Sequence, residues 1–384
     1  MASLYDYIRK NGDFTFSEKP FCDVDSVLLT HSFYLPVETV YKNLNGKETT
    51  LRDLYLKTYE LRGSKHKAVG LVLSKHVSIE AVMMARSRRF GDIKVLDLSE
   101  TFTTTPAVQF AAMTLRLDDG TLAVVYRGTD DSIIGWKEDL DLLAKRGIPS
   151  HELAVDYLNA AAEKYDGDIL VCGHSKGGNL ALWAAVKSSE KARKRIKGLY
   201  NLEGPGFFNY HIYGTKEYSE LLKVYHHLIP QGAFIGVMLA HDNDYTVIKS
   251  NGIIGPIQHD PHTWLTDTDN LIYLPGLSLM GKMNDVFMKK LIEVIPEEYY
   301  GTIEKVADNI VKGLGQLYLV DFVKNIGPSL KGAVKAWQDT DPEMKEEFKN
   351  SFKGAGKVLG SSLKEVRAEF ISEKTEAEQP AFAE

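Results

Sequence analysis

Residues 171–181 read VCGHSKGGNLA, an apolar run that leads directly into a serine among glycines. Two kinds of site use such a turn, a serine nucleophile and a phosphate cradle. A phosphate-binding loop needs G-x-x-x-x-G-K-[ST], and the order Ser-Lys-Gly-Gly does not meet that pattern. Residues 173–177 instead fit G-x-S-x-G, the strand-to-helix turn that exposes a nucleophilic serine. Ser175 is therefore the predicted nucleophile, and a glycine-rich turn without chemistry is the alternative.

The glycines around Ser175 have a steric reason. A sharp turn from strand to helix presses the two elements together at the positions two before and two after the serine, so only small residues fit there. Gly173 and Gly177 occupy these positions, and Gly178 follows them. Free N–H groups at the start of the helix favour developing negative charge. We expect these glycines to support the site and Ser175 to react.

A second polar motif, Arg127-Gly128-Thr129, ends an apolar strand upstream of the serine. In α/β-hydrolases such a loop supplies one oxyanion N–H group, and the residue after the nucleophile supplies the other. The predicted donors are therefore Thr129 and Lys176, with Gly128 supporting the loop. The loss of one such donor costs about 3–4 kcal/mol of barrier. Taken alone, the Arg-Gly-Thr motif would be interpreted as a polar turn.

The segments VVYRGTDDSIIGWKEDL (124–140) and VCGHSKGGNLALWAA (171–185) together resemble the lipase class 3 family. The segments FSEKPFCDVDSVLLTHSFYL, EGPGF and QHDPHTW resemble a largely uncharacterised bacterial branch of that superfamily, and the resemblance covers roughly residues 14–265. It implies an α/β-hydrolase fold, and it implies that Trp136 and Asp139 hold the oxyanion loop. Lys176 departs from the pattern, because lipases carry an apolar residue there, and this argues against a strongly hydrophobic substrate.

A serine nucleophile needs a base, which in this fold is a histidine late in the chain. The histidines that follow Ser175 are His211, His226, His227, His241, His259 and His262. A catalytic histidine is typically carried on a loop, and the stretch GPIQHDPHTW has that character. The resemblance favours His259, since the lipases have a histidine followed closely by tryptophan, here Trp264. For a loop histidine such as His262, a solvated side chain is the usual interpretation.

The acid that orients the base has two candidates. The lipases place an aspartate after the strand that follows the EGPGF-type turn, but HHLIPQGAFIG (226–236) contains no carboxylate. Glu203 lies at a predicted strand end, where Gly204 and Pro205 would aim its side chain. Asp244, with Asp242 behind it, is the other candidate. We favour Glu203, although a solvated turn carboxylate is the usual fate of such residues.

Residues 110–265 alternate strand-like and helix-like segments. Strands are predicted within 110–129, as a hairpin turning at DDG, and at 167–173 and 196–207. Helices are predicted at 149–165 and after Ser175. This alternation is typical of an α/β fold with a mostly parallel central sheet flanked by helices. The aromatic segment 207–218 is either a lid over the serine or a packed excursion.

The domain organisation follows from these patterns. We expect a helical N-terminal section packed on the core over residues 1–90, an α/β-hydrolase core over 91–275 and a C-terminal helical section over 276–370. The polar, acidic stretch 371–384 is expected to be disordered.

Composition narrows the function. The chain has 384 residues, 44% hydrophobic and 26% charged, with a net charge of −6 that offers no case for nucleic acid. Its two cysteines, Cys22 and Cys172, are weak support for a disulfide framework. We recognise no signal peptide, no membrane span, no metal-ligand spacing and no dinucleotide motif, and expect a cytoplasmic protein without a cofactor. The oligomeric state is left open.

The sequence thus predicts a serine hydrolase of carboxylic esters, among them lipid esters, that works through an acyl-enzyme. Ser175 would attack, His259 would move the proton, and Glu203 or Asp244 would orient the histidine. Two alternatives remain: an acyltransferase with the same triad, and a non-catalytic binding protein on the same fold.

Overall fold

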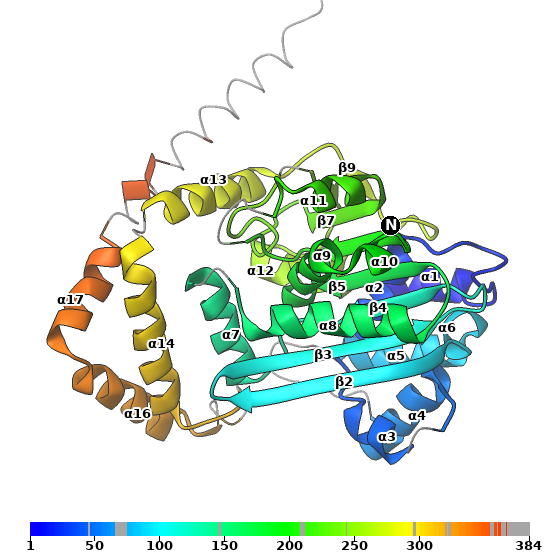
Figure 1. Ribbon diagram of the computed structural model, residues 1–384, viewed down its shortest axis with the longest axis horizontal. Coiled ribbons are helices and arrows are strands. Elements are labelled where there is room, and N and C mark those ends of the chain that lie inside the picture. Colours follow the sequence, from blue (N-terminus) through cyan, green and yellow to red (C-terminus); the bar gives the residue numbers. More distant parts are fainter. Residues whose placement is uncertain are drawn as a thin grey trace, which may run out of the picture.

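The computed structural model describes residues 1–366, apart from 45–46, 66–74, 145–146, 208–211, 243, 295–296, 319–320, 322–323, 354–356, 359 and 362–365. Its centre is one sheet whose strands lie side by side in chain order (Figure 1). The strands are β1 (Thr49–Thr50), β2 (Lys94–Thr104), β3 (Ala107–Arg116), β4 (Leu122–Tyr126), β5 (Ile169–His174), β6 (Ile196–Leu202), β7 (Tyr225–Pro230), β8 (Thr246–Ile248) and β9 (Tyr273–Leu274).

The direction of the strands changes across the sheet. Pairings from β4 to β8 are parallel, whereas those from β1 to β4 and between β8 and β9 are antiparallel. The predicted hairpin is confirmed as β3 and β4. The expectation of a mostly parallel sheet holds for its centre and is wrong for its ends. The long strand β2 escaped prediction because its sequence KVLDLSETFTT is polar and half exposed, so it lacks the apolar run of a central strand.

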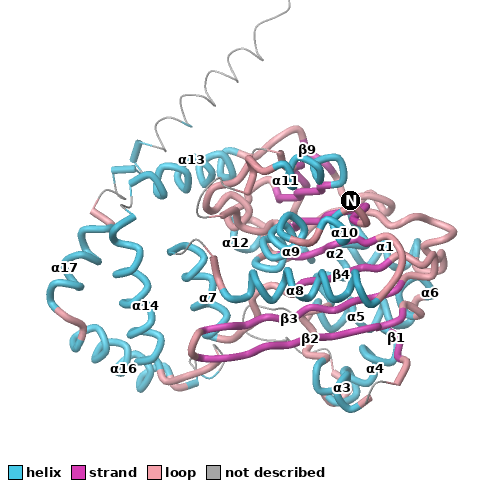
Figure 2. Tube along the Cα trace, in the orientation of Figure 1, coloured by secondary structure: helices cyan, strands magenta, loops and turns pink. Residues whose placement is uncertain are grey.

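Helices lie on both faces of the sheet (Figure 2). The N-terminal helices are α1 (Leu4–Asn11), α2 (Asp23–Ser32), α3 (Glu38–Asn43), α4 (Leu51–Leu61), α5 (His76–Arg86) and α6 (Arg88–Gly91). The helices within the α/β region are α7 (Ile133–Ala144), α8 (Pro149–Lys164), α9 (Lys176–Lys187), α10 (Glu190–Arg193), α11 (Lys216–Leu221) and α12 (Gly255–Gln258). The last helices described are α13 (Leu279–Val294), α14 (Tyr300–Leu314), α16 (Ile326–Asp339) and α17 (Pro342–Ser351). The three short 3-10 helices are η1 (Leu222–Val224), η2 (Pro261–Thr263) and η3 (Glu297–Tyr299).

The two largest apolar cores lie on opposite faces of the sheet, and the alternation of side chains along a strand decides which residue enters which core. On β4, Ala123 and Val125 face the N-terminal helices α1, α2, α4 and α5, whereas Val124 and Tyr126 face α8 and α9. Successive side chains of a strand point to opposite faces. A strand buried on both faces is therefore apolar throughout, which is why β4 and β5 read as continuous apolar runs.

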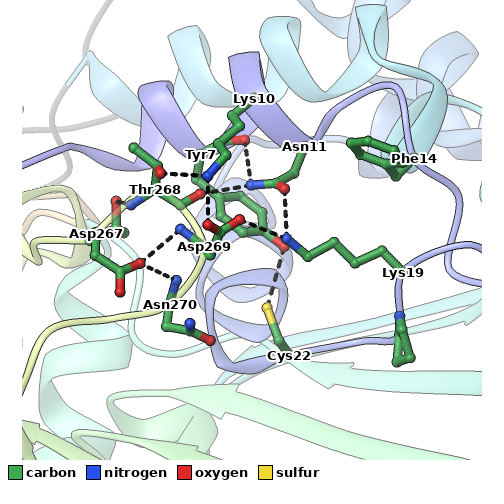
Figure 3. Close-up of polar contacts among 12 residues, drawn as sticks. Tyr7, Lys10, Asn11, Phe14, Lys19, Cys22, Asp267, Thr268, Asp269 and Asn270 are labelled. Atoms are coloured by element: carbon green, nitrogen blue, oxygen red, sulfur yellow. Dashed lines mark hydrogen bonds and ion pairs between the residues drawn. The ribbon is translucent and has the colours of Figure 1, made fainter.

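The N-terminal section is fastened to the far end of the core by a polar cluster, drawn in Figure 3. Asp269 accepts hydrogen bonds from the ammonium groups of Lys10 at 2.5 Å and Lys19 at 2.8 Å. Asn11 donates through its side-chain nitrogen to the carbonyl oxygen of Thr268 at 2.7 Å. Helix α1 therefore contacts a loop about 250 residues further along the chain.

The C-terminal helices extend away from the sheet beyond α7 (Figure 1). Helix α14 packs on both α7 and α16. On α7, Lys137 pairs at 2.8 Å with Asp308 of α14. Within the described part of the chain, each helix is too short or too polar to cross a membrane. The stretch 371–384, expected to be disordered, lies outside the described residues.

Candidate active site

Ser175 occupies the turn between β5, which ends at His174, and α9, which begins at Lys176. Its backbone has φ 58° and ψ −134°, a combination that costs a residue with a side chain about 1–3 kcal/mol. The surroundings hold it there: its N–H donates to the carbonyl oxygen of Leu202 at 3.0 Å, and its own carbonyl accepts from Gly178 at 2.8 Å. The strained strand-to-helix turn lies at Ser175, where the G-x-S-x-G motif predicts it.

The glycines that flank Ser175 lie where no side chain would fit. A Cβ atom on Gly173 would overlap the carbonyl oxygen of Gly177, and one on Gly177 would overlap the carbonyl oxygen of Tyr126. A Cβ atom on Gly178 would overlap the side-chain oxygen of Asn201. The strand and the helix approach each other at backbone contact, as the motif predicts.

His259 and Glu203 are joined by a hydrogen bond. His259 Nδ1 lies 2.8 Å from Glu203 Oε2, and the carboxylate accepts, so Nδ1 carries the proton and Nε2 is the basic nitrogen. The other carboxylate oxygen of Glu203 accepts from the N–H of Phe234 at 3.2 Å. Glu203 is completely buried at the end of β6 and has a positive φ of 47°. His259 directly follows α12 and shares one pocket with Ser175.

His174, the residue before the serine, holds the backbone of His259. Its Nε2 lies 3.0 Å from the carbonyl oxygen of His259 and donates to it, while its Nδ1 lies 3.0 Å from the hydroxyl of Tyr34, which donates in turn. The rings of His174 and His259 stack with centroids 4.5 Å apart. Burial holds the pKa of His174 well below its ordinary value, so this ring is neutral.

The predicted oxyanion loop lies beside the serine. Thr129 lines the pocket, and its hydroxyl donates to Asp139 on α7 at 2.8 Å. Burial raises the pKa of Asp139 to about 6 against the opposing effects of the Lys176 charge and the Thr129 hydrogen bond. A Cβ atom on Gly128 would overlap the hydroxyl of Tyr34, so this position is close-packed as well.

The side chain of Lys176 points away from the pocket. It is 1% exposed, and its ammonium nitrogen pairs with Glu138 at 2.7 Å and donates to the carbonyl and side-chain oxygens of Gln109 at 2.8 and 2.9 Å. The backbone N–H of Lys176 lies at the first position of α9, where N–H groups have no intrahelical partner. The lysine that departs from the lipase pattern is therefore a structural cation beneath the turn.

The pocket itself encloses about 150 Å³. Its apolar walls are Trp136, Ile235, Pro256 and Pro261. This volume is below the 300–1,000 Å³ typical of sites for drug-sized ligands. The pocket can hold a small group next to Ser175, while the rest of a larger ligand would lie outside it.

Four further polar residues line the pocket and were not site candidates from the sequence: His31, Tyr34, His174 and Asp260. His31 and Tyr34 belong to the segment FSEKPFCDVDSVLLTHSFYL. The one available signal was polar side chains within an otherwise apolar helix.

The remaining candidates lie elsewhere. Asp244, the second candidate acid, is exposed in the loop before β8. Burial, together with the charge of Asp244, raises the pKa of Asp242 to about 7. His259 hydrogen-bonds to Glu203, so the structure favours Glu203 as the partner of His259. Other candidate histidines pair with carboxylates: His226 with Asp23, His241 with Asp285 and His262 with Glu80. His227 is buried 4.0 Å from Asp242 without a hydrogen bond to it, and burial lowers the pKa of His227 to about 3. The candidate His211 lies outside the described residues.

The aromatic segment 207–218 packs into the core as far as it is described. Phe207, Ile212 and Tyr218 are buried, and Phe207 contacts the ring of Trp183 at 5.5 Å between centroids. None of these three side chains lines the serine pocket. The packed excursion is favoured over the lid for these residues, while 208–211 lie outside the described residues.

These features define a mixed α/β protein with a strained serine turn at the carboxyl end of its central parallel strands. The family described as Mbeg1-like matches residues 84–310, which is more than half of the chain, and the protein belongs to that family. The matched range contains Ser175, Glu203 and His259. No curated protein and no solved structure matches this chain. Among the described residues, no group of three His, Cys, Asp or Glu side chains is arranged to hold a metal ion.

Proposed function

We propose that this protein has an α/β-hydrolase fold and is a serine hydrolase that cleaves carboxylic esters through an acyl-enzyme. The observation that carries the proposal is the hydrogen bond of 2.8 Å between His259 Nδ1 and a fully buried Glu203, because His259 lines the same pocket as the strained Ser175. In chain order, the nucleophile Ser175 then comes first, the acid Glu203 second and the base His259 last, as in that fold.

In the proposed mechanism, Ser175 Oγ attacks the ester carbonyl and His259 Nε2 takes its proton. The N–H groups of Thr129 and Lys176 donate to the oxyanion of the tetrahedral intermediate. His259 returns the proton to the leaving alcohol, and water then releases the acid by the reverse sequence. Glu203 holds the imidazole in the tautomer that leaves Nε2 basic and stabilises its charged form. The residues need no cofactor for these steps.

The pocket volume of about 150 Å³ supports esters with small acyl groups. Short-chain p-nitrophenyl esters are therefore expected to turn over faster than long-chain ones, because a long chain would leave the pocket and lie against solvent.

Fluorophosphonate labelling of the purified protein tests the proposal, with p-nitrophenyl butyrate and palmitate as substrates. Labelling and turnover are expected to vanish in Ser175→Ala and to persist in Ser219→Ala. Ser219 is an exposed serine on α11 and serves as the matched control. Absence of labelling in the folded wild type would contradict the triad and favour a binding protein. Labelling without hydrolysis would favour an acyltransferase, to be tested by product analysis with added alcohols, amines and thiols.

A further inference from the structure

A second buried cluster lies behind the loop that carries His259. His31, on α2, is 2% exposed and lies between two carboxylates. Its Nδ1 is 2.5 Å from Glu80 Oε2 on α5, and its Nε2 is 3.3 Å from Asp260 Oδ1. Glu80 is completely buried, and the side chain of Asp260 is 30% exposed. These groups are distinct from Ser175, Glu203 and His259.

The contacts of His31 favour a doubly protonated ring. A neutral imidazole donates from one nitrogen only, whereas both nitrogens of His31 face carboxylate oxygens. Burial alone would lower the pKa of His31, but the charges and hydrogen bonds of Glu80 and Asp260 outweigh it and raise the pKa to about 10. The same contacts hold the pKa of Asp260 well below its usual range. At neutral pH the cluster is a carboxylate, an imidazolium and a carboxylate.

The cluster fixes the chain on the C-terminal side of His259. Asp260 is the next residue, and its Oδ1 also accepts from the N–H of His262 at 2.9 Å. Glu80 Oε1 lies 3.0 Å from Nδ1 of His262. Both carboxylates that hold His31 therefore also hold the turn Pro261–Thr263.

The remaining neighbours extend the cluster into the N-terminal helices. The ring of His262 stacks on that of His76 with centroids 3.4 Å apart, and Nδ1 of His76 lies 2.6 Å from the Tyr5 hydroxyl. The titratable groups that surround His31 are Glu80 and His76 on α5, Tyr5 on α1, Tyr34 after α2, His174 on β5, and Asp260 and His262 on the loop.

We infer that His31 is a positioning residue of the active site: its buried imidazolium, bridging Glu80 and Asp260, sets the place of His259 relative to Ser175. The inference rests on the proposed hydrolase function. His174 holds the carbonyl of His259 from one side, and His31 holds the following residue from the other. A misplacement of about 1 Å at a catalytic group lowers rates by about 100-fold, so this bracing has a kinetic consequence.

The test is His31→Gln, which keeps hydrogen-bonding capacity and removes the charge. We expect the fluorophosphonate labelling rate and kcat to fall about 10- to 100-fold with little change in KM. We also expect the acid limb of the kcat/KM profile to move to higher pH. The uncompensated Asp260 carboxylate next to His259 would favour protonated His259, so the base would be lost at a higher pH.

The matched control is Tyr55→Phe, which removes a buried hydrogen bond of 2.8 Å between Tyr55 of α4 and Ser32 of α2, the helix that also carries His31. It is expected to lower the unfolding midpoint and leave the labelling rate and the pH profile unchanged. Should His31→Gln fail to fold, His31→Gln/Glu80→Gln removes the unpaired buried carboxylate and takes its place in the same measurements.

The outcomes separate the two proposals. A labelled wild type with an equally fast His31→Gln variant and an unshifted pH profile overturns the positioning role and leaves the hydrolase proposal intact. A folded wild type that is not labelled overturns both. A ¹⁵N NMR titration of the wild type that finds a neutral His31 ring at pH 7 overturns the imidazolium bridge independently of activity.

Discussion

At the scale of single residues, the proposed triad combines strain with burial. Ser175 and Glu203 both have positive φ, and they directly follow the neighbouring parallel strands β5 and β6. Non-glycine residues adopt this region rarely, and it costs free energy that the surrounding contacts must offset. The strained turn exposes Ser175 to the pocket. Glu203 is buried next to His259, where water screens its charge least.

Replacement of the acid distinguishes the two carboxylates considered from the sequence. Glu203→Gln keeps the shape and removes the charge that stabilises protonated His259, so kcat is expected to fall by about 10³- to 10⁴-fold. Asp244→Asn alters an exposed carboxylate outside the pocket and is expected to leave kcat unchanged. Ester hydrolysis by both purified variants checks this. A large loss in Asp244→Asn with none in Glu203→Gln would reverse the assignment.

At the scale of elements, a buried ion pair joins the pieces of the predicted oxyanion hole. Lys176 at the start of α9 pairs with Glu138 of α7 and donates to Gln109 of β3. The hydroxyl of Ser150 on α8 donates to the other oxygen of Glu138 at 2.5 Å. The next residue of α7, Asp139, holds Thr129. The pair thus ties both predicted N–H donors to one rigid set of elements.

Removal of the cation alone should be costly. Lys176→Leu leaves Glu138 charged and buried, and is expected to lower the free energy of unfolding by about 3–5 kcal/mol. Lys176→Leu/Glu138→Gln is expected to recover most of that loss, because no unpaired charge remains and Gln still accepts from Ser150. Urea unfolding of both variants measures this, with Lys194→Leu, in an exposed pair with Glu190, as a control that changes stability little. A double variant no more stable than Lys176→Leu would contradict the role of the unpaired charge.

At the scale of the whole molecule, the N-terminal helices belong to the same folding unit as the sheet. The family match begins at residue 84, yet α1, α2, α4 and α5 cover one face of the sheet and supply much of one core. Arg89 is clamped by Asp25 of α2 through bonds of 2.8 and 2.6 Å, and neither side chain is exposed. The boundary predicted at residue 90 remains a prediction, but α2 already reaches the serine pocket through His31, and Glu80 of α5 contacts His31.

Two aspartates that pair with cations of the N-terminal section, Asp25 within it and Asp269 outside it, should differ sharply in their effect on stability. Asp25→Asn leaves Arg89 buried without its counter-charge and is expected to cost about 3–5 kcal/mol of unfolding free energy. Asp269→Asn alters the exposed cluster of Figure 3, where water screens the charges, and is expected to change stability little. Denaturant unfolding with one shared transition is expected. Separate transitions for the N-terminal section and the sheet would contradict a single unit.

A structural feature could be predicted from the sequence when interactions between residues close together in the chain decide it. The serine turn and the β3–β4 hairpin were predictable because neighbouring residues decide them: glycines at fixed offsets and a turn between alternating apolar runs. Strand β2 was not, because its ladder to β3 gives it stability that its own polar sequence does not signal.

The sequence by itself determined the serine turn, the alternation of strands and helices, and a short set of candidate partners for Ser175. Only the tertiary structure decided among those partners. Glu203 and His259 are 56 residues apart, and Lys176 and Glu138 are 38 apart. The placement of the parallel strands and of the loops at their carboxyl ends brings such pairs together, and no local pattern records it. The contact between His31 and Asp260 is also one that no local pattern records, since packing of α2 against the sheet creates it.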